Sequence, residues 1–183
     1  MKREKLISAG LALTLLACAR EPAESLLYNN TNDIVVDSVD DNVTMVNLDQ
    51  SYLKIYNIAH KEVLSVLERD NLAHEQCNKE DDVSVEVVVT THADLNKMRE
   101  SGAWGQALAI AGNISGFFEW TKSDKGFYRM YLVRDGAVSF EELFVHEYVH
   151  AYFFANCVVK LNSLSLDQEE KYAEEIRKNY LKR

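Results

Sequence analysis

The chain has 183 residues, of which 47% are hydrophobic, so it is long enough for one domain with its own core. Its formal net charge is −9 at pH 7. An acidic chain is a poor match for the phosphate backbone, so this charge argues against nucleic acid as the partner.

The first 17 residues have the features of an export signal. A basic segment, MKREK, precedes an uncharged apolar run that ends at Ala17 and is too short to span a bilayer. The sequence LLAC, ending at Cys18, resembles the lipobox of bacterial lipoproteins, in which the cysteine is lipidated. The resemblance implies a signal peptide over residues 1–17 and a membrane anchor on Cys18. We therefore expect a place in the bacterial cell envelope, on the periplasmic face of the outer membrane. The alternatives are a plain secretory signal with an incidental cysteine, or a short anchor helix.

The next segment is polar and acidic, and it contains the only proline, Pro22. This composition predicts a flexible tether over residues 18–47, with at most a short strand at residues 34–36. A single folded domain is then expected over residues 48–183. Apolar residues at helical spacing predict a long amphipathic helix, Leu48–Ala73, as its first element.

The middle of the chain predicts strands. Residues 82–91 are rich in β-branched side chains and read as one strand, and a short helix is expected from His92 to Met98. Residues 102–116 are small and are expected to be irregular. Two aromatic-rich runs, Phe117–Trp120 and Phe127–Val133, flank a polar turn with a glycine and predict a β-hairpin.

A buried helix is predicted next. Ser139 and Glu142 form the capping pattern S-x-x-E, and the following residues are apolar on most sides of a helix. This helix carries the pattern HExxH at His146, Glu147 and His150. Residues four apart share one helix face, so the two imidazoles can bind one metal ion, while Glu147 can hold a water on that ion.

The alternative is a pair of core histidines that fall four residues apart by chance. Two buried histidines and a buried glutamate would each need hydrogen-bond partners, because burial removes their hydration. A zinc ion meets that need with the ligand types found here. We therefore expect Zn²⁺ as the cofactor.

A final helix should supply a further ligand. Ser165 and Gln168 form a second capping pattern, which opens a helix to about Tyr180. A catalytic zinc ion generally takes three protein ligands and keeps a fourth position for water. Glu169 and Glu170 are the candidates. By helical angle Glu169 lies nearer the centre of the apolar face and Glu170 lies on its shoulder, and the residues alone leave the choice open.

The order of hairpin, HExxH helix, turn and glutamate-bearing helix resembles the gluzincin branch of zinc metallopeptidases, over about residues 83–180. The closest likeness is to compact bacterial domains of the peptidase MA type, in which the third ligand opens the pattern Glu-x-x-Ala-Glu. Residues Glu170 to Glu174 match this pattern, although Lys171 replaces the usual glycine and Glu169 the usual asparagine. The resemblance implies Glu170 as the third ligand, Glu169 as the second choice, and Glu174 as an outer partner of a ligand histidine.

The resemblance implies an α+β, zincin-like domain in which a small mixed sheet with the hairpin packs on the HExxH helix and the C-terminal helix. It also implies a zinc-dependent peptidase acting on peptides or proteins. Glu147 would be the general base for a zinc-activated water. Tyr172, Tyr180 and His92 are the candidate donors to the oxyanion. The competing hypothesis is a non-catalytic zinc-binding lipoprotein that acts as an interaction or scaffold module.

Two cysteines remain besides the expected lipid site. Export would place Cys77 and Cys157 in an oxidising compartment, where an even number of thiols predicts one disulfide. We expect this bridge to tie the end of the HExxH helix to an earlier loop. The alternative is a pair of buried thiols.

Overall fold

The computed structural model describes residues 43–46, 48, 52–75, 83–100, 115–120, 122–123 and 126–183. The fold is α+β, as the sequence predicts. Cys18 and Cys77 lie outside these residues, as does the strand considered at residues 34–36. The elements in chain order are β1 (Val43–Val46), α1 (Leu53–Arg69), β2 (Val83–Thr90), α2 (His92–Glu100), β3 (Gly116–Glu119), β4 (Tyr128–Val133), α3 (Phe140–Ala155), α4 (Val158–Leu161) and α5 (Leu166–Leu181).

The four strands form one mixed sheet in the order β1-β2-β4-β3. β1 and β4 run parallel to β2, whereas β3 runs antiparallel to β4. The parallel step from β1 to β2 passes through α1, and β3 and β4 form the predicted hairpin. β3 therefore lies at the edge of this sheet.

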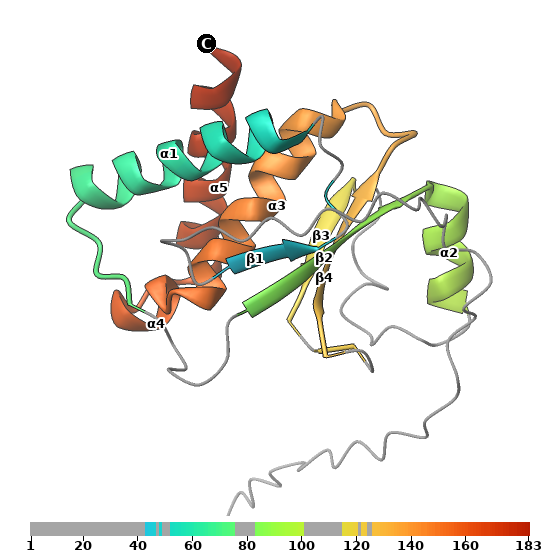
Figure 1. The fold of residues 1–183 in the computed structure, drawn as a ribbon, viewed down its shortest axis with the longest axis horizontal. Helices are drawn as coiled ribbons and strands as arrows, with labels where there is room; N and C mark the ends of the chain where they lie inside the picture. The colour runs from blue at the N-terminus through green and yellow to red at the C-terminus, as the bar shows by residue number, and fades with distance from the viewer. Residues whose placement is uncertain are drawn as a thin grey trace, which may run out of the picture.

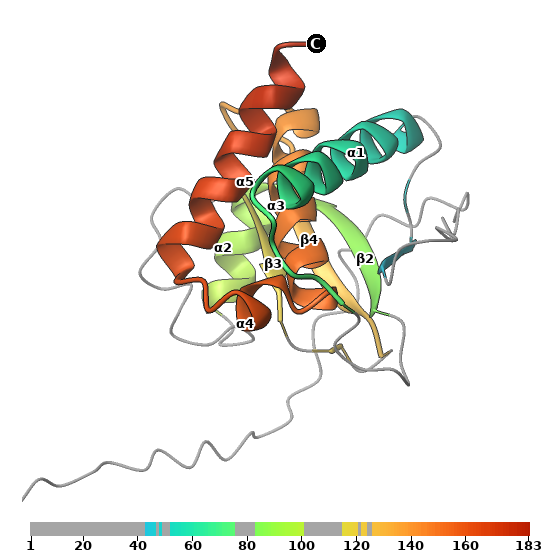
Figure 2. The same ribbon diagram turned by 90° about the vertical axis from the view of Figure 1, so that its left-hand side faces the viewer.

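Helices α1, α3 and α5 lie on one side of the sheet, and α2 lies on the other (Figure 1). The view turned by 90° in Figure 2 shows α5 running alongside α3. α3 packs against the sheet and against both α1 and α5. Phe144, Tyr148 and Phe153 on α3 are fully buried. The HExxH helix is thus the centre of the core.

The start of α3 agrees with the capping pattern in the sequence. Ser139 has an extended backbone, and its hydroxyl accepts a hydrogen bond from the N–H of Glu142. The helix ends at Ala155, because Cys157 takes a left-handed conformation with φ of 52°. The short helix α4 then continues in a new direction.

The folded domain begins earlier than residue 48, where the sequence analysis places its start. Val43 and Met45 of β1 are fully buried, and the strand pairs with β2. Only four residues, VTMV, form this strand, and the acidic residues around them make the segment look like part of the tether. α1 is also shorter than the predicted helix Leu48–Ala73, since it begins at Leu53.

Cys157 is disulfide-bonded. Its expected partner, Cys77, is not among the described residues, but the chain just before it lies beside Cys157. The N–H of Glu75 donates a hydrogen bond to the carbonyl of Asn156 at 3.0 Å. The side-chain amide of Asn162 bonds both the N–H and the carbonyl of Ala73. These contacts hold the loop after α1 against the end of α3, as the expected bridge requires.

We expect Cys157→Ser to lower the free energy of unfolding by about 2–5 kcal/mol, because the crosslink no longer restricts the unfolded chain. Urea titration of the oxidised wild type and the variant measures this difference. Treatment of the wild type with reductant should produce the same loss. Equal stability of oxidised and reduced wild type would contradict this role.

Candidate metal centre

His146, His150 and Glu170 each direct one ligand atom toward the others. The two histidine Nε2 atoms are 3.3 Å apart. Glu170 Oε2 lies 3.4 Å from His146 Nε2, and Glu170 Oε1 lies 3.5 Å from His150 Nε2. Ligands at 2.0–2.1 Å from a tetrahedral zinc ion are about 3.3–3.4 Å from one another. The three side chains could therefore hold a metal ion, and their spacing fits zinc.

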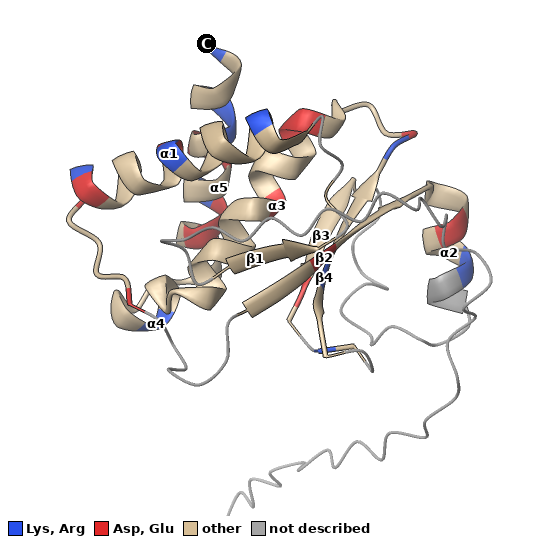
Figure 3. Ribbon diagram, viewed as in Figure 1, with Lys and Arg blue, Asp and Glu red and all other residues tan. Residues whose placement is uncertain are grey.

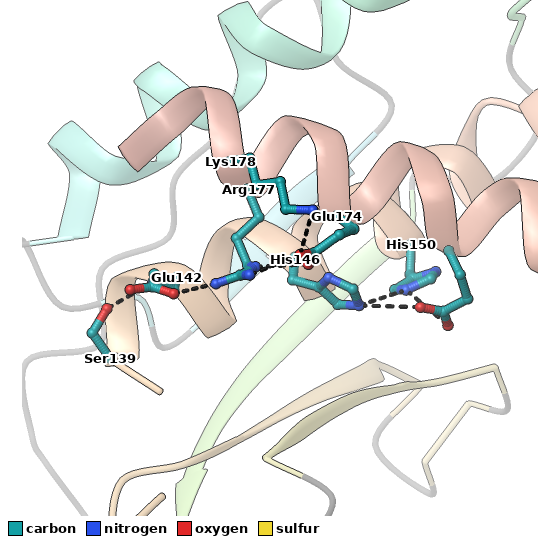
Figure 4. A network of polar contacts seen from close by, with 8 residues as sticks. Ser139, Glu142, His146, His150, Glu174, Arg177 and Lys178 are labelled. Atoms are coloured by element: carbon teal, nitrogen blue, oxygen red, sulfur yellow. Dashed lines mark hydrogen bonds and ion pairs between the residues drawn. The ribbon is translucent and has the colours of Figure 1, made fainter. Parts of the chain in front are cut away.

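Two helices bring these groups together. His146 and His150 lie on successive turns of α3, and their rings meet at the surface that faces α5 (Figure 4). α5 packs closely on α3, and its residues Ala173 and Ile176 are apolar and fully buried in the hydrophobic core. This packing brings the first turns of α5, with Glu170, beside the middle of α3.

Glu169 supports His150 from the opposite side of the ring. Its side chain is only 2% exposed, and its Oε1 accepts a hydrogen bond from His150 Nδ1 at 2.7 Å. Because a carboxylate accepts this bond, we assign the proton to Nδ1, which leaves the lone pair of the neutral ring on Nε2. A carboxylate behind a histidine orients metal ligands in this way. Glu170 instead reaches the Nε2 atoms, so the two neighbouring glutamates have different tasks.

Glu174 is expected from the sequence to be an outer partner of a ligand histidine, but its hydrogen bonds lie elsewhere. Its recorded bonds are to Arg177 and Lys178 on its own helix. Arg177 also pairs with Glu142, in the first turn of α3, and so links the two helices next to His146 (Figure 4). Among the described residues, Glu169 accepts the hydrogen bond of His150 Nδ1, the contact that an outer partner of a candidate ligand would make.

Glu147 is buried beside the edge strand, with 5% of its surface exposed. Its carboxylate accepts a hydrogen bond from the backbone N–H of Phe118. Burial raises the pKa of Glu147 to about 8, an effect that His150 opposes and Glu170 reinforces. Glu147 is thus a buried acid next to the two histidines.

The pKa values of the two histidines shift in opposite directions. Burial, and then the charge of His150, lowers the pKa of His146. Burial alone would lower the pKa of His150 as well, but its hydrogen bond to Glu169 and the nearby negative charges raise it overall.

The charge balance of the cluster also suits a cation. Acidic residues of α3 and α5 lie close together where the helices run side by side (Figure 3). Two of them, Glu169 and Glu170, lie within 2.7–3.5 Å of the imidazole nitrogens. The buried Oε2 atom of Glu169 has no hydrogen-bond partner within the part of the chain that the structure describes. Buried negative charge is costly unless it is paired, and a divalent cation would provide the pairing charge.

No protein family, curated protein or solved structure matches the chain. A fold class alone does not imply a function. The chemistry must therefore be argued from the side chains that the structure brings together.

The three candidates for an oxyanion donor have partners elsewhere in the fold. The ring of Tyr172 packs on Phe153 at 5.9 Å, and its hydroxyl bonds Asp70. Tyr180 packs against the core at the far end of α5. His92 Nδ1 lies 2.9 Å from Asp135, beyond the end of β2. No recorded contact among the described residues joins any of the three to the ligand set.

Gly116 is a site residue that the sequence analysis does not single out. A Cβ atom at this position would lie 3.0 Å from Oε1 of Glu147. The sequence does contain one signal for this position, because Gly116 is a glycine in the strand GFFE, directly before two aromatic residues. Glycine inside a strand often marks a close approach of another group.

Proposed function

We propose that the chain is a zinc-dependent peptidase, similar to gluzincins, in which His146, His150 and Glu170 hold the zinc ion. The observation that carries the proposal is the triangle of ligand atoms, with separations of 3.3–3.5 Å, next to a buried acid, Glu147. A structural zinc site is closed by four protein ligands, whereas a catalytic site has three and an open position. The side chain of Glu170 is 53% exposed, so this cluster opens toward solvent.

When bound, zinc supplies a Lewis acid that polarises a carbonyl and makes water more acidic. The other roles belong to the protein. Glu147 takes a proton from the attacking water and delivers it to the leaving amine. The N–H of Phe118 holds the Glu147 carboxylate in place, and Glu169 keeps His150 in the tautomer that presents Nε2.

The edge strand supports a peptide as the substrate. The N–H of Val133 donates to the carbonyl of Ser115 at 2.8 Å, which fixes the phase of the ladder between β3 and β4. Gly116 and Phe118 therefore direct their backbone polar groups away from β4, and of these groups the N–H of Phe118 bonds Glu147. An extended peptide can add to such an edge through main-chain hydrogen bonds. Glu147 lies at this same edge, where the peptide would pass.

The sequence LLAC, which resembles a lipobox, supports a location for the protein. We propose that Cys18 carries a lipid that anchors the domain in the bacterial cell envelope, on the periplasmic face of the outer membrane. None of the described helices is long and apolar enough to cross a membrane.

Hydrolysis of an unstructured peptide library by the mature protein in detergent tests the activity. We expect cleavage that stops when a chelator removes zinc and returns when zinc is restored, with products identified by mass spectrometry. Zinc-loaded protein that cleaves none of the peptides would contradict the peptidase and favour the non-catalytic zinc-binding scaffold.

A further inference from the structure

Gly116 lies directly against the side chain of Glu147. A Cβ atom on Gly116 would be 3.0 Å from Oε1 and 3.1 Å from Cγ of Glu147, and 3.1 Å from the carbonyl oxygen of Tyr131. Carbon atoms pack at about 3.5–4.0 Å, so even a methyl group would force its neighbours to move. A side chain on Gly116 would therefore fit only if one of these neighbours shifts by a few tenths of an ångström.

Space, rather than backbone conformation, selects glycine at this position. Gly126 in the hairpin turn has φ of 84°, a value that favours glycine. Gly116 is not among the described residues with positive φ, and it lies in a regular strand. An alanine could therefore adopt this backbone and would differ from glycine only in what its methyl group meets.

Of the neighbours of Gly116, the Glu147 side chain is the one that would yield. The carbonyl of Tyr131 belongs to β4, where Tyr131 is paired with Phe117 in the ladder. Moving it would disturb the centre of the hairpin. The carboxylate of Glu147 instead lies at the end of a flexible side chain and accepts a hydrogen bond from the backbone N–H of Phe118. A methyl group on Gly116 would push this carboxylate away from β3.

We propose that Gly116 is a positioning residue, whose missing side chain sets the place of the Glu147 carboxylate between β3 and the two histidines. Phe118 provides the hydrogen bond and Gly116 provides the space. The inference rests on the proposed function in one respect, that Glu147 is the general base. The packing of Gly116 on Glu147 does not depend on catalysis.

Gly116→Ala should lower kcat by about 10-fold, because the Glu147 carboxylate must shift by a few tenths of an ångström and a misplacement of about 1 Å costs about 100-fold. KM and the zinc content should stay at wild-type values, because the methyl group contacts none of the three ligands. Gly136→Ala is the matched control. A Cβ on Gly136 would have its nearest contact at 3.5 Å, with Ser115 Oγ, which is ordinary packing, so its kcat should not change.

A double-mutant cycle on stability tests the packing without any activity. Gly116→Ala should lower the urea midpoint of the wild type, but lower it less in a Glu147→Ala background, where Oε1 and Cγ are absent. The contact with Tyr131 is common to both backgrounds and cancels. If Gly116→Ala alone does not fold, the double variant should fold, because the conflict with Glu147 has been removed.

Wild-type kcat in Gly116→Ala, or equal loss of stability in both backgrounds, would overturn the role of Gly116. So would failure of both the single and the double variant to fold. These outcomes differ from failure of the proposed function, which is shown by full hydrolysis in Glu147→Gln. In that case the stability cycle would still report whether Gly116 and Glu147 are coupled.

Discussion

Replacing Glu147 by glutamine should lower kcat for peptide hydrolysis by about 10²- to 10⁴-fold, the contribution typical of a positioned general base. The amide oxygen can still accept the hydrogen bond from Phe118, so the side chain keeps its place. The amide cannot take up the proton of the attacking water. The three proposed zinc ligands are unchanged, so elemental analysis should find the wild-type amount of zinc.

Glu141→Gln provides the matched control for this experiment. Glu141 lies in the first turn of the same helix and outside the cluster of histidines, and its variant should keep wild-type kcat. Undiminished hydrolysis by Glu147→Gln would remove Glu147 as the base. Loss of zinc from Glu147→Gln would mean that the residue acts on the metal site rather than on the proton.

Removal of Glu170 should weaken zinc binding more than removal of Glu169. Glu170→Ala deletes one of the three ligand atoms beside the Nε2 pair. Glu169→Ala keeps all three but leaves His150 Nδ1 without its acceptor. Loss of such an outer partner reduces metal affinity by about 10- to 100-fold, and the loss of a ligand should exceed this range. Competition with a chromogenic zinc chelator measures both values of Kd.

Two further variants serve as controls for the zinc Kd values of Glu170→Ala and Glu169→Ala. Glu175→Ala, on the same helix, removes an acid that pairs with Arg69 and should leave the zinc Kd unchanged. Glu169→Gln retains an oxygen that can accept from His150, so its Kd should fall between those of the wild type and Glu169→Ala. If Glu169→Ala bound zinc more weakly than Glu170→Ala, Glu169 would be the ligand and Glu170 the accessory acid.

The helical part of the site follows from local sequence. The spacing of His146 and His150 places both rings on one face, and the Ser165 pattern marks the start of α5. Helical angle also predicts that Glu169 is more buried than Glu170, as the structure confirms. What each glutamate contacts depends on how α5 crosses α3, and the periodicity of one helix carries no information about that crossing.

The pairing of Glu174 with Arg177 and Lys178 has a signal in the sequence. Arg177 and Lys178 follow it by three and four residues, the spacing at which charges pair on a helix surface. The contact between Gly116 and Glu147 has only a weak signal in the sequence. It depends on a contact between a strand and a helix that are distant in sequence.

Elemental analysis of the purified mature protein tests the metal centre most directly. We expect one zinc ion per chain in the wild type and little zinc in His150→Ala. His60→Ala, which changes a histidine of α1 bonded to Tyr148, should keep its zinc. A wild-type protein without metal, or His150→Ala with its full zinc content, would contradict the metal centre and the peptidase built on it.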